Sequence, residues 1–271
     1  TSIKIINSIS KKVGAPSYRK TPVFRKKKND KKFNNPNFIK TEFLEKIDEN
    51  IINQDKIREL LNKLTNNNYE ELSEEIINNL KHFIYTQNDI ILMDFGVSIF
   101  EISSVNRFWV KLYAKLFNKL ISHFPKMHSI CVNQYTHLLN IFDNIEFGNE
   151  TNYDEFCKIN KANDKRRSLV SFYTELYKYD ILGNDEIKIL LDKLFKLIKN
   201  TSDKQIFDEI YENIDIVLKE IGEVLIEEQI GDNIRENLIE ILDILNKTNI
   251  SRKIKFKILD IFEALDIEID D

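Results

Sequence analysis

From about residue 53 to the C-terminus, apolar residues recur at every third or fourth position, with only short polar interruptions. This spacing places the apolar side chains on one face of a helix and predicts a succession of amphipathic helices. The 271-residue chain has only 6 glycines and 4 prolines, whereas a β-rich or α/β fold of this size needs many more turn residues. The sequence therefore predicts an all-α protein.

The polar interruptions divide the periodic region into ten predicted helices, which pair into five hairpins of about 35–50 residues. A single hairpin cannot bury its own apolar stripe, so stacked neighbours must supply the core, and we expect an α-solenoid. A helical bundle is the alternative, but it would more often use fewer helices of more uniform length. Polar breaks predict helix N-caps at Asn68, Asn106, Asp185 and Ser251. The predicted helices span residues 54–64, 67–84, 89–104, 106–124, 128–147, 153–181, 184–199, 203–228, 232–247 and 251–267.

Charge is distributed unevenly along the chain. Residues 1–40 contain 12 Lys and Arg but one acid, Asp30, which leaves 28 basic and 43 acidic residues for the remainder. We therefore expect an extended basic N-terminal arm (residues 1–50) on an acidic helical domain (residues 51–271). The arm either lies along its own acidic domain or contacts RNA phosphates, because clustered cations release counterions on binding. The predicted RNA-binding residues are Arg25, Lys26, Lys27, Lys28, Lys31 and Lys32.

The sequence contains no recognisable catalytic motif. Its glycines are scattered singly, so they cannot form a phosphate-binding loop. His128 and Cys131 have a spacing that suits a metal, but no second pair accompanies them, and structural zinc sites usually need four ligands. We expect a protein that is not an enzyme and that has no metal site and no cofactor.

Two further groups of residues have competing interpretations. Trp109 lies in a segment where Phe108, Leu112, Leu116 and Leu120 repeat at helical spacing, which favours a core position for these side chains. Arg166 and Arg167 could form a polar ridge that contacts RNA, but a solvated helix face is the favoured interpretation.

The cellular location is predicted from what the chain lacks. No apolar run is long enough to span a membrane, and the first residues lack the apolar block of a signal peptide. Cys131 and Cys157 lie within helical patterns and are typical of reduced core thiols. We expect a soluble, cytoplasmic protein.

Several segments resemble a known family in the same order along the chain. Residues 57–65 (IRELLNKLT), followed by Tyr69, are similar to the opening of the middle domain of eukaryotic translation initiation factor 4 gamma. Residues 99–114 resemble its second repeat, and residues 165–177 resemble its basic-Ser-Leu and Phe-x-Gly-Glu-Leu-Phe stretch. Residues 251–260 resemble its last helix, and together these segments cover about 54–267.

The resemblance implies a fold, a partner and a set of contacts. The middle domain in this family is a crescent of five HEAT repeats that binds both RecA-like lobes of a DEAD-box RNA helicase and stimulates it without performing chemistry. Leu61 and Leu64 lie on one helix face and are equally suited to the core, so Asn62, Lys63 and Tyr69 are the better reporters of an interface. The helicase contacts implied by the resemblance are Phe24, Leu61, Asn62, Lys63, Leu64 and Tyr69.

The match to the family has gaps. Lys4-Ile5-Ile6 resembles a stretch upstream of the family domain, but Phe24 stands where a Trp is usual. The Tyr-x4-Leu motif that recruits the cap-binding subunit is absent: the segment from Tyr18 to Phe24 lacks the leucine, and Pro22 would break its short helix. A cap-binding subunit would therefore need a different mode of binding.

Two other functions stay open at this stage. Related middle domains restrain or recruit helicases in nuclear mRNA processing and surveillance, although the Leu-Asn-Lys-Leu-Thr run favours translation. The second alternative is a purely protein-binding adaptor, in which the Arg25–Lys28 cluster serves as a localisation signal.

Overall fold

The computed structural model describes residues 58–86, 90–146, 153–248 and 250–268. All described residues belong to one compact unit within residues 46–271. Residues 58–63 are helical, and the elements that follow are α3 (Tyr69–Thr86), α4 (Ile90–Val105), the 3-10 helix η1 (Arg107–Trp109), α5 (Val110–His123), α6 (Met127–Asn140), α7 (Tyr153–Tyr177), α8 (Asn184–Lys199), α9 (Lys204–Glu227), α10 (Gly231–Thr248) and α11 (Arg252–Ala264).

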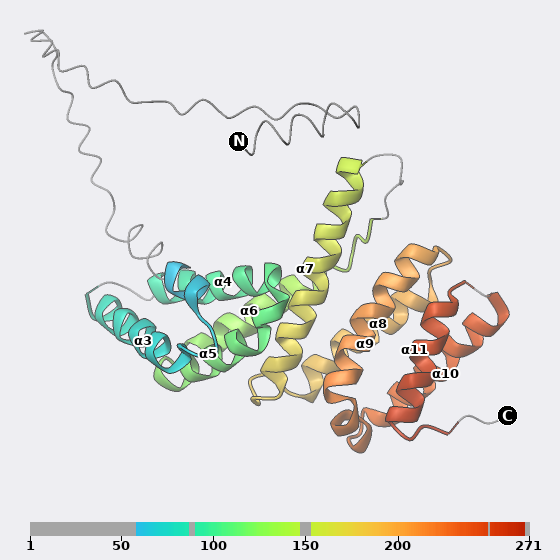
Figure 1. Cartoon of the computed structure of the whole chain (residues 1–271). Helices are drawn as coiled ribbons and strands as arrows, with labels where there is room; N and C mark the ends of the chain where they lie inside the picture. The colour runs from blue at the N-terminus through green and yellow to red at the C-terminus, as the bar shows by residue number, and fades with distance from the viewer. Residues whose placement is uncertain (1–57, 87–89, 147–152, 249, 269–271) are drawn as a thin grey trace, which may run out of the picture. The chain divides into compact units, whose positions relative to one another are not determined.

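The helices pair in sequence order into five hairpins, beginning with residues 58–63 and α3 and ending with α10 and α11 (Figure 1). The second helices of the hairpins stack on one another, since α3 packs on α5, α5 on α7, α7 on α9, and α9 on α11. The first helices form the other layer, in which α4 packs on α6 and α8 on α10. The described part of the chain contains no strand. The predicted all-α solenoid of five hairpins is therefore confirmed.

An aromatic cluster holds the middle of the stack together. The rings of Phe117 and Phe172 both meet Phe100 edge-on, with ring centroids 5.3 and 5.1 Å from it. Tyr135 of α6 packs edge-on against Tyr173 of α7 at 5.6 Å and donates its hydroxyl proton to a backbone carbonyl at the start of α8. Such edge-to-face pairs add about 0.5–1.5 kcal/mol each beyond their buried area. One continuous core therefore joins the second, third and fourth hairpins.

The helix predicted over residues 89–104 runs one residue further than expected. Ser103 and Ser104 are buried inside α4, which continues to Val105. The Ser104 hydroxyl donates to the backbone carbonyl of Glu101 at 2.6 Å, so the serine satisfies its own polar group within the helix.

Only one of the four predicted N-caps is confirmed. The Ser251 hydroxyl accepts the backbone N–H of Ile254. Asn106 makes no capping bond, Asn68 bonds backward into the preceding turn, and Asp185 lies inside α8 after Gly183. Local composition marked the turns correctly but did not identify which polar side chain each turn uses.

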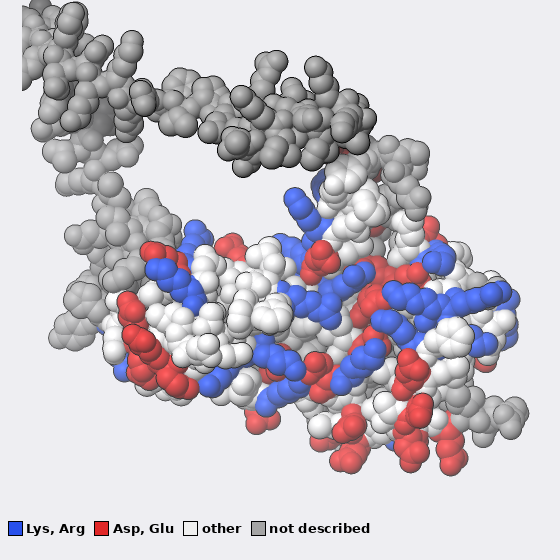
Figure 2. Space-filling view, in the orientation of Figure 1, with Lys and Arg blue, Asp and Glu red and all other residues white. Residues whose placement is uncertain are grey.

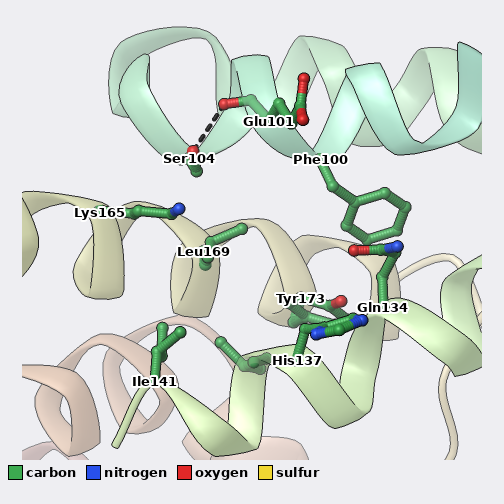
Figure 3. A pocket seen from close by; sticks show the side chains of 10 residues that line it. Phe100, Glu101, Ser104, Gln134, His137, Ile141, Lys165, Leu169 and Tyr173 are labelled. Carbon is green, nitrogen blue, oxygen red and sulfur yellow. Dashed lines mark hydrogen bonds between the residues drawn. The ribbon is translucent and has the colours of Figure 1, made fainter. Parts of the chain in front are cut away.

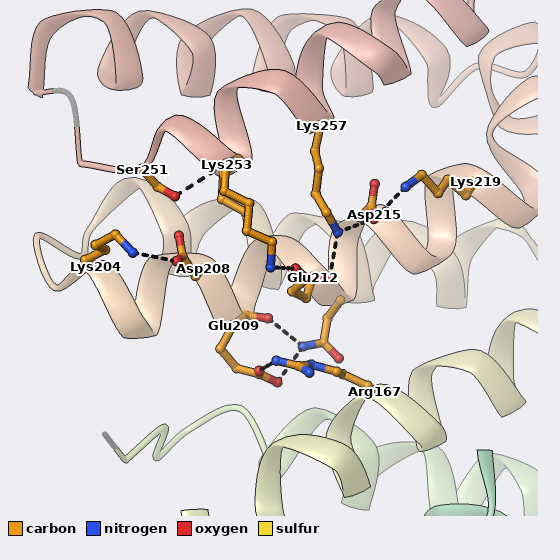
Figure 4. Close-up of polar contacts among 12 residues, drawn as sticks. Arg167, Lys204, Asp208, Glu209, Glu212, Asp215, Lys219, Ser251, Lys253 and Lys257 are labelled. Atoms are coloured by element: carbon orange, nitrogen blue, oxygen red, sulfur yellow. Dashed lines mark hydrogen bonds and ion pairs between the residues drawn. The ribbon is translucent and has the colours of Figure 1, made fainter. Parts of the chain in front are cut away.

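Arg166 and Arg167 do not form the solvated face expected from the sequence. Arg166 is 5% exposed and lies 3.8 Å from Glu209 of α9, which is 3% exposed. Arg167 donates to the other oxygen of Glu209, and Asn213 donates to the same carboxylate at 3.1 Å (Figure 4). These residues form a buried polar joint between the third and fourth hairpins.

The structure also bears on the membrane and thiol expectations. No helix among the described residues is long and apolar enough to cross a membrane. Cys131 is fully buried and Cys157 is half-buried, and both are free thiols. Burial raises the pKa of Cys131 to about 12, so this thiol stays protonated at neutral pH.

Candidate protein-interaction surface

The first functional segment predicted from the sequence ends in a turn that Asn68 organises. The Asn68 side-chain oxygen accepts the backbone N–H of Thr65 at 2.7 Å and its hydroxyl at 2.9 Å. Its amide group donates to the backbone carbonyl of Lys63 at 2.9 Å. One side chain therefore satisfies three polar groups of the connection between residues 58–63 and α3.

The structure separates the predicted helicase contacts into a buried and an exposed set. Leu61, Leu64 and Tyr69 are 0%, 1% and 3% exposed, so they are core residues of the first hairpin. Asn62 and Lys63 are exposed, and Lys63 pairs with Glu59 at 2.6 Å. Of the predicted helicase contacts that the structure describes, only Asn62 and Lys63 are accessible to a partner.

Tyr69 has a structural role that the sequence did not indicate. The Lys115 ammonium lies 3.8 Å from the centre of the Tyr69 ring, a cation–π contact between α5 and α3. Burial raises the pKa of the Tyr69 hydroxyl. Lys119 adds an ion pair to Glu74 of α3 at 2.7 Å. The ring therefore joins the first hairpin to the second, and it is not a reporter of an external interface.

An exposed aromatic residue lies where the sequence predicted core. Phe108 is 82% exposed and stacks edge-on against Trp109, which is half-buried. The neighbouring Val105 is 80% exposed. The reason is the 3-10 helix at Arg107–Trp109: its three-residue turn moves Phe108 off the face that carries the buried Leu112.

A groove of about 350 Å³ runs beside this aromatic pair. It is bordered by the Asn68-organised turn, η1 and the first turn of α5, together with two positions of α7 and one of α9. Its lining residues are Asn66, Arg107, Phe108, Trp109, Val110, Lys111, Leu112, Ser171, Glu175 and Glu220.

The charges in the groove are held in place by one another. Lys111 lies 3.4 Å from Glu220 and 3.7 Å from Glu175, and Lys178 of α7 bonds to both carboxylates. The hydrogen bond from Lys178 holds the pKa of Glu220 below its ordinary value. The groove therefore presents an aromatic edge beside a rigid polar wall that joins the second, third and fourth hairpins.

The surface formed by Asn66, Arg107, Phe108 and Trp109 with its groove, here named the aromatic groove, unites three segments that the sequence comparison singled out separately. Residues 57–65 end at it, residues 99–114 supply its rim, and residues 165–177 supply its wall. Exposed aromatic side chains next to anchored charges are typical of protein interfaces.

Other predicted site residues lie elsewhere. Phe24 and the RNA-binding residues Arg25, Lys26, Lys27, Lys28, Lys31 and Lys32 lie outside the described residues. His128 is exposed while Cys131 is buried, and within the described residues no group of three or more His, Cys, Asp or Glu could hold a metal ion.

Comparison with known proteins identifies the fold. No protein-family model matches the chain, and no curated protein matches its sequence. The structure is similar to the crystal structure of the MIF4G domain of Trypanosoma cruzi translation initiation factor EIF4G5, with a TM-score of 0.51. The chain has a MIF4G fold.

The match covers 79% of this chain and 95% of the trypanosomal domain at 16% sequence identity. The matched region therefore includes nearly the whole of the trypanosomal domain. This agrees with the family resemblance found in the sequence. The comparison shows that this chain and a domain of a translation initiation factor share one helical fold.

Proposed function

We propose that the protein is a translation-initiation scaffold that binds a DEAD-box RNA helicase and stimulates it within an mRNA cap-binding complex in the cytoplasm. The MIF4G fold and the resemblance of residues 57–65 to factor 4 gamma support this proposal. The aromatic groove carries the argument, because it is an exposed apolar surface directly beside that segment. A rigid scaffold that touches both RecA-like lobes lowers the entropic cost of closing them.

The aromatic groove is proposed as one helicase contact, with Asn62 and Lys63 on the exposed side of the adjoining helix. Phe24 and the basic arm would supply a second contact and bind RNA. The Asn62 amide and the Lys63 ammonium are accessible without any change in the fold.

Phe108→Ala tests the groove. Because Phe108 is 82% exposed, its removal leaves the core intact, and the free energy of unfolding should change by less than about 0.5 kcal/mol. As an interface anchor, the same change should weaken helicase binding by at least about tenfold. Binding is measured by calorimetry with the full-length chain, and RNA-dependent ATPase activity of the helicase is measured in parallel.

Phe256→Ala is the matched control, since Phe256 is a 66% exposed phenylalanine on α11. Its binding and stimulation should equal those of the unaltered chain. Equal losses in the two variants, or no loss in Phe108→Ala, would remove the groove from the proposal. Substitutions at Leu64 or Tyr69 cannot serve as this test, because both side chains are buried and their removal would unfold the first hairpin.

The sign of the ATPase effect tests the process. Stimulation supports the translation role, whereas inhibition would favour the alternative of a scaffold that restrains a helicase in nuclear mRNA processing. A chain that binds neither helicase nor RNA at low salt would be a purely protein-binding adaptor.

A further inference from the structure

The N-terminal half of α7 projects beyond the neighbouring helices (Figure 1). Its sequence carries three lysines on one face. Lys158, Lys161 and Lys165 follow one another at spacings of three and four residues, so they lie within a narrow arc of the helix. All three are exposed, and within the described residues none of them forms an ion pair. Figure 2 shows basic side chains along the α4 side of this projecting part. We name these three residues the lysine stripe.

The lysine stripe leads into a pocket between α4, α6 and α7. The pocket has a volume of about 110 Å³, and Lys165 lies on its rim. Its floor is apolar and includes Phe100, Leu169 and Tyr173, while Gln134 and His137 of α6 border it (Figure 3). An enclosed cavity of about 150 Å³ holds a benzene ring, so this smaller pocket, which opens to solvent, can receive the edge of one ring.

The rim has unused hydrogen-bonding capacity. Within the described residues, neither the Gln134 amide nor the His137 ring has a hydrogen-bond partner. Ser104 uses its proton within α4, which leaves its oxygen free to accept. Glu101 is the acidic group on the rim, and Arg58 balances it at 3.6 Å. The pocket can therefore donate to and accept from a planar polar ring without repelling a nearby anion.

These features fit one class of partner. We propose that single-stranded RNA binds along α7, with its phosphates on the lysine stripe and one base in the pocket. The stripe spans about 10 Å, which is roughly three nucleotide steps of a stacked strand. Proteins that bind single-stranded RNA commonly take an unstacked base and hydrogen-bond its edges. An acidic peptide would also bind the lysines, but it would leave the Gln134 amide and the His137 imidazole without hydrogen-bond partners.

This site extends the RNA contact proposed for the basic arm to the folded domain, and it does not depend on helicase binding. The test uses the full-length chain and a fluorescent 12-nucleotide single-stranded RNA in a salt series. Replacing all three lysines of the stripe by Gln should weaken binding at least about tenfold. It should also reduce the slope of log K against log salt by about 2, since each phosphate contact on a single strand contributes about 0.7.

The matched control changes the same charge elsewhere on the domain. Lys196→Gln, Lys247→Gln and Lys255→Gln lie on α8, α10 and α11, and together they should leave the slope unchanged. A loss in the stripe variant equal to that in the control would overturn the proposal. If Lys26→Gln/Lys27→Gln/Lys28→Gln alone abolishes binding and the stripe variant keeps the full slope, the arm is the RNA site and the stripe is not.

A second measurement tests the pocket itself. An RNA that carries 4-thiouridine should crosslink on irradiation to the segments that border the pocket, residues 134–141 and 165–173. The crosslinks are located by mass spectrometry, and Gln134→Ala should reduce them without reducing the salt slope. If polyglutamate of the same charge displaces the RNA at equal concentration, the surface recognises anions in general and the assignment to RNA fails.

Discussion

The two long faces of α7 both carry basic residues, which are paired and largely buried on one face and exposed on the other. Arg166 and Arg167 point to α9 and meet Glu209 there, with Arg166 and Glu209 almost fully buried. Figure 4 shows Arg167 against Glu209. Lys161 and Lys165 lie on the α4 side, where both are exposed and have no partner in the described residues. Basic residues that adjoin in sequence thus serve different purposes.

This difference distinguishes the basic residues of a helix that stabilise the fold from those that are free to bind a ligand. A buried charge needs a partner, because desolvation without compensation costs several kcal/mol. An exposed charge needs none, so its placement is free to serve a ligand. The face toward α9 should therefore control stability, and the face toward α4 should control binding.

The largest effect should come from removing the centre of the buried joint. Glu209→Ala leaves the Arg166 guanidinium buried without its counter-charge, so the free energy of unfolding should fall by about 3–5 kcal/mol. Urea unfolding followed by circular dichroism measures it. Glu240→Ala removes an exposed partner of Lys199 and should cost less than about 1 kcal/mol. Similar losses in both variants would show that burial does not distinguish the two pairs.

The burial of Arg166, one side of this joint, could have been predicted from the sequence. Arg166 lies seven residues after Ile159 and four before Val170, both of which are buried, so it falls on the apolar stripe of α7. An arginine on such a stripe must find an acid. Glu209 lies 43 positions further along the chain, and nothing in the local pattern singles it out from the other acids of α9. The partner could be found only from the packing of the two helices.

The candidate binding surface shows the same limit. Apolar periodicity predicted the five hairpins and most of the core, since those depend on burial along single helices. It placed Phe108 in the core because it assumed one continuous helix, and the short 3-10 turn at Arg107–Trp109 was not visible in composition. The groove depends on residues from four hairpins, from Asn66 of the first to Glu220 of α9 in the fourth. Sequence segments could therefore name its parts without showing that they meet.

An intermediate effect is expected at the acidic groups next to the buried joint. Burial alone would raise the pKa of Glu212, but hydrogen bonds from Lys253 and Lys257 lower it to about 2. A lowered folded-state pKa adds stability that is present above the unfolded value near 4.5 and is lost as the pH falls toward 2. With solvent screening, the contribution at neutral pH should be about 1–2 kcal/mol.

Glu212→Gln should therefore destabilise the protein at pH 7, and the gap to the unaltered chain should narrow between pH 5 and pH 2. Thermal unfolding at a series of pH values measures this gap. A gap that stays constant over that range would mean that Glu212 acts through packing and not through its charge.

The smallest effect on stability is expected from the lysine stripe, and it gives the sharpest test of the difference between the two faces of α7. Replacing Lys158, Lys161 and Lys165 together by Gln should change the free energy of unfolding by less than about 0.5 kcal/mol, because none of these ammonium groups has a partner to lose in the part of the chain that the structure describes. Arg167→Gln, only two residues beyond Lys165, removes a hydrogen bond to the buried Glu209 and should cost about 1–3 kcal/mol. Both variants are compared by urea unfolding at the same salt concentration. If the triple lysine variant were the less stable of the two, the lysine stripe would be part of the scaffold, and the loss of RNA binding could no longer be read as the loss of a contact.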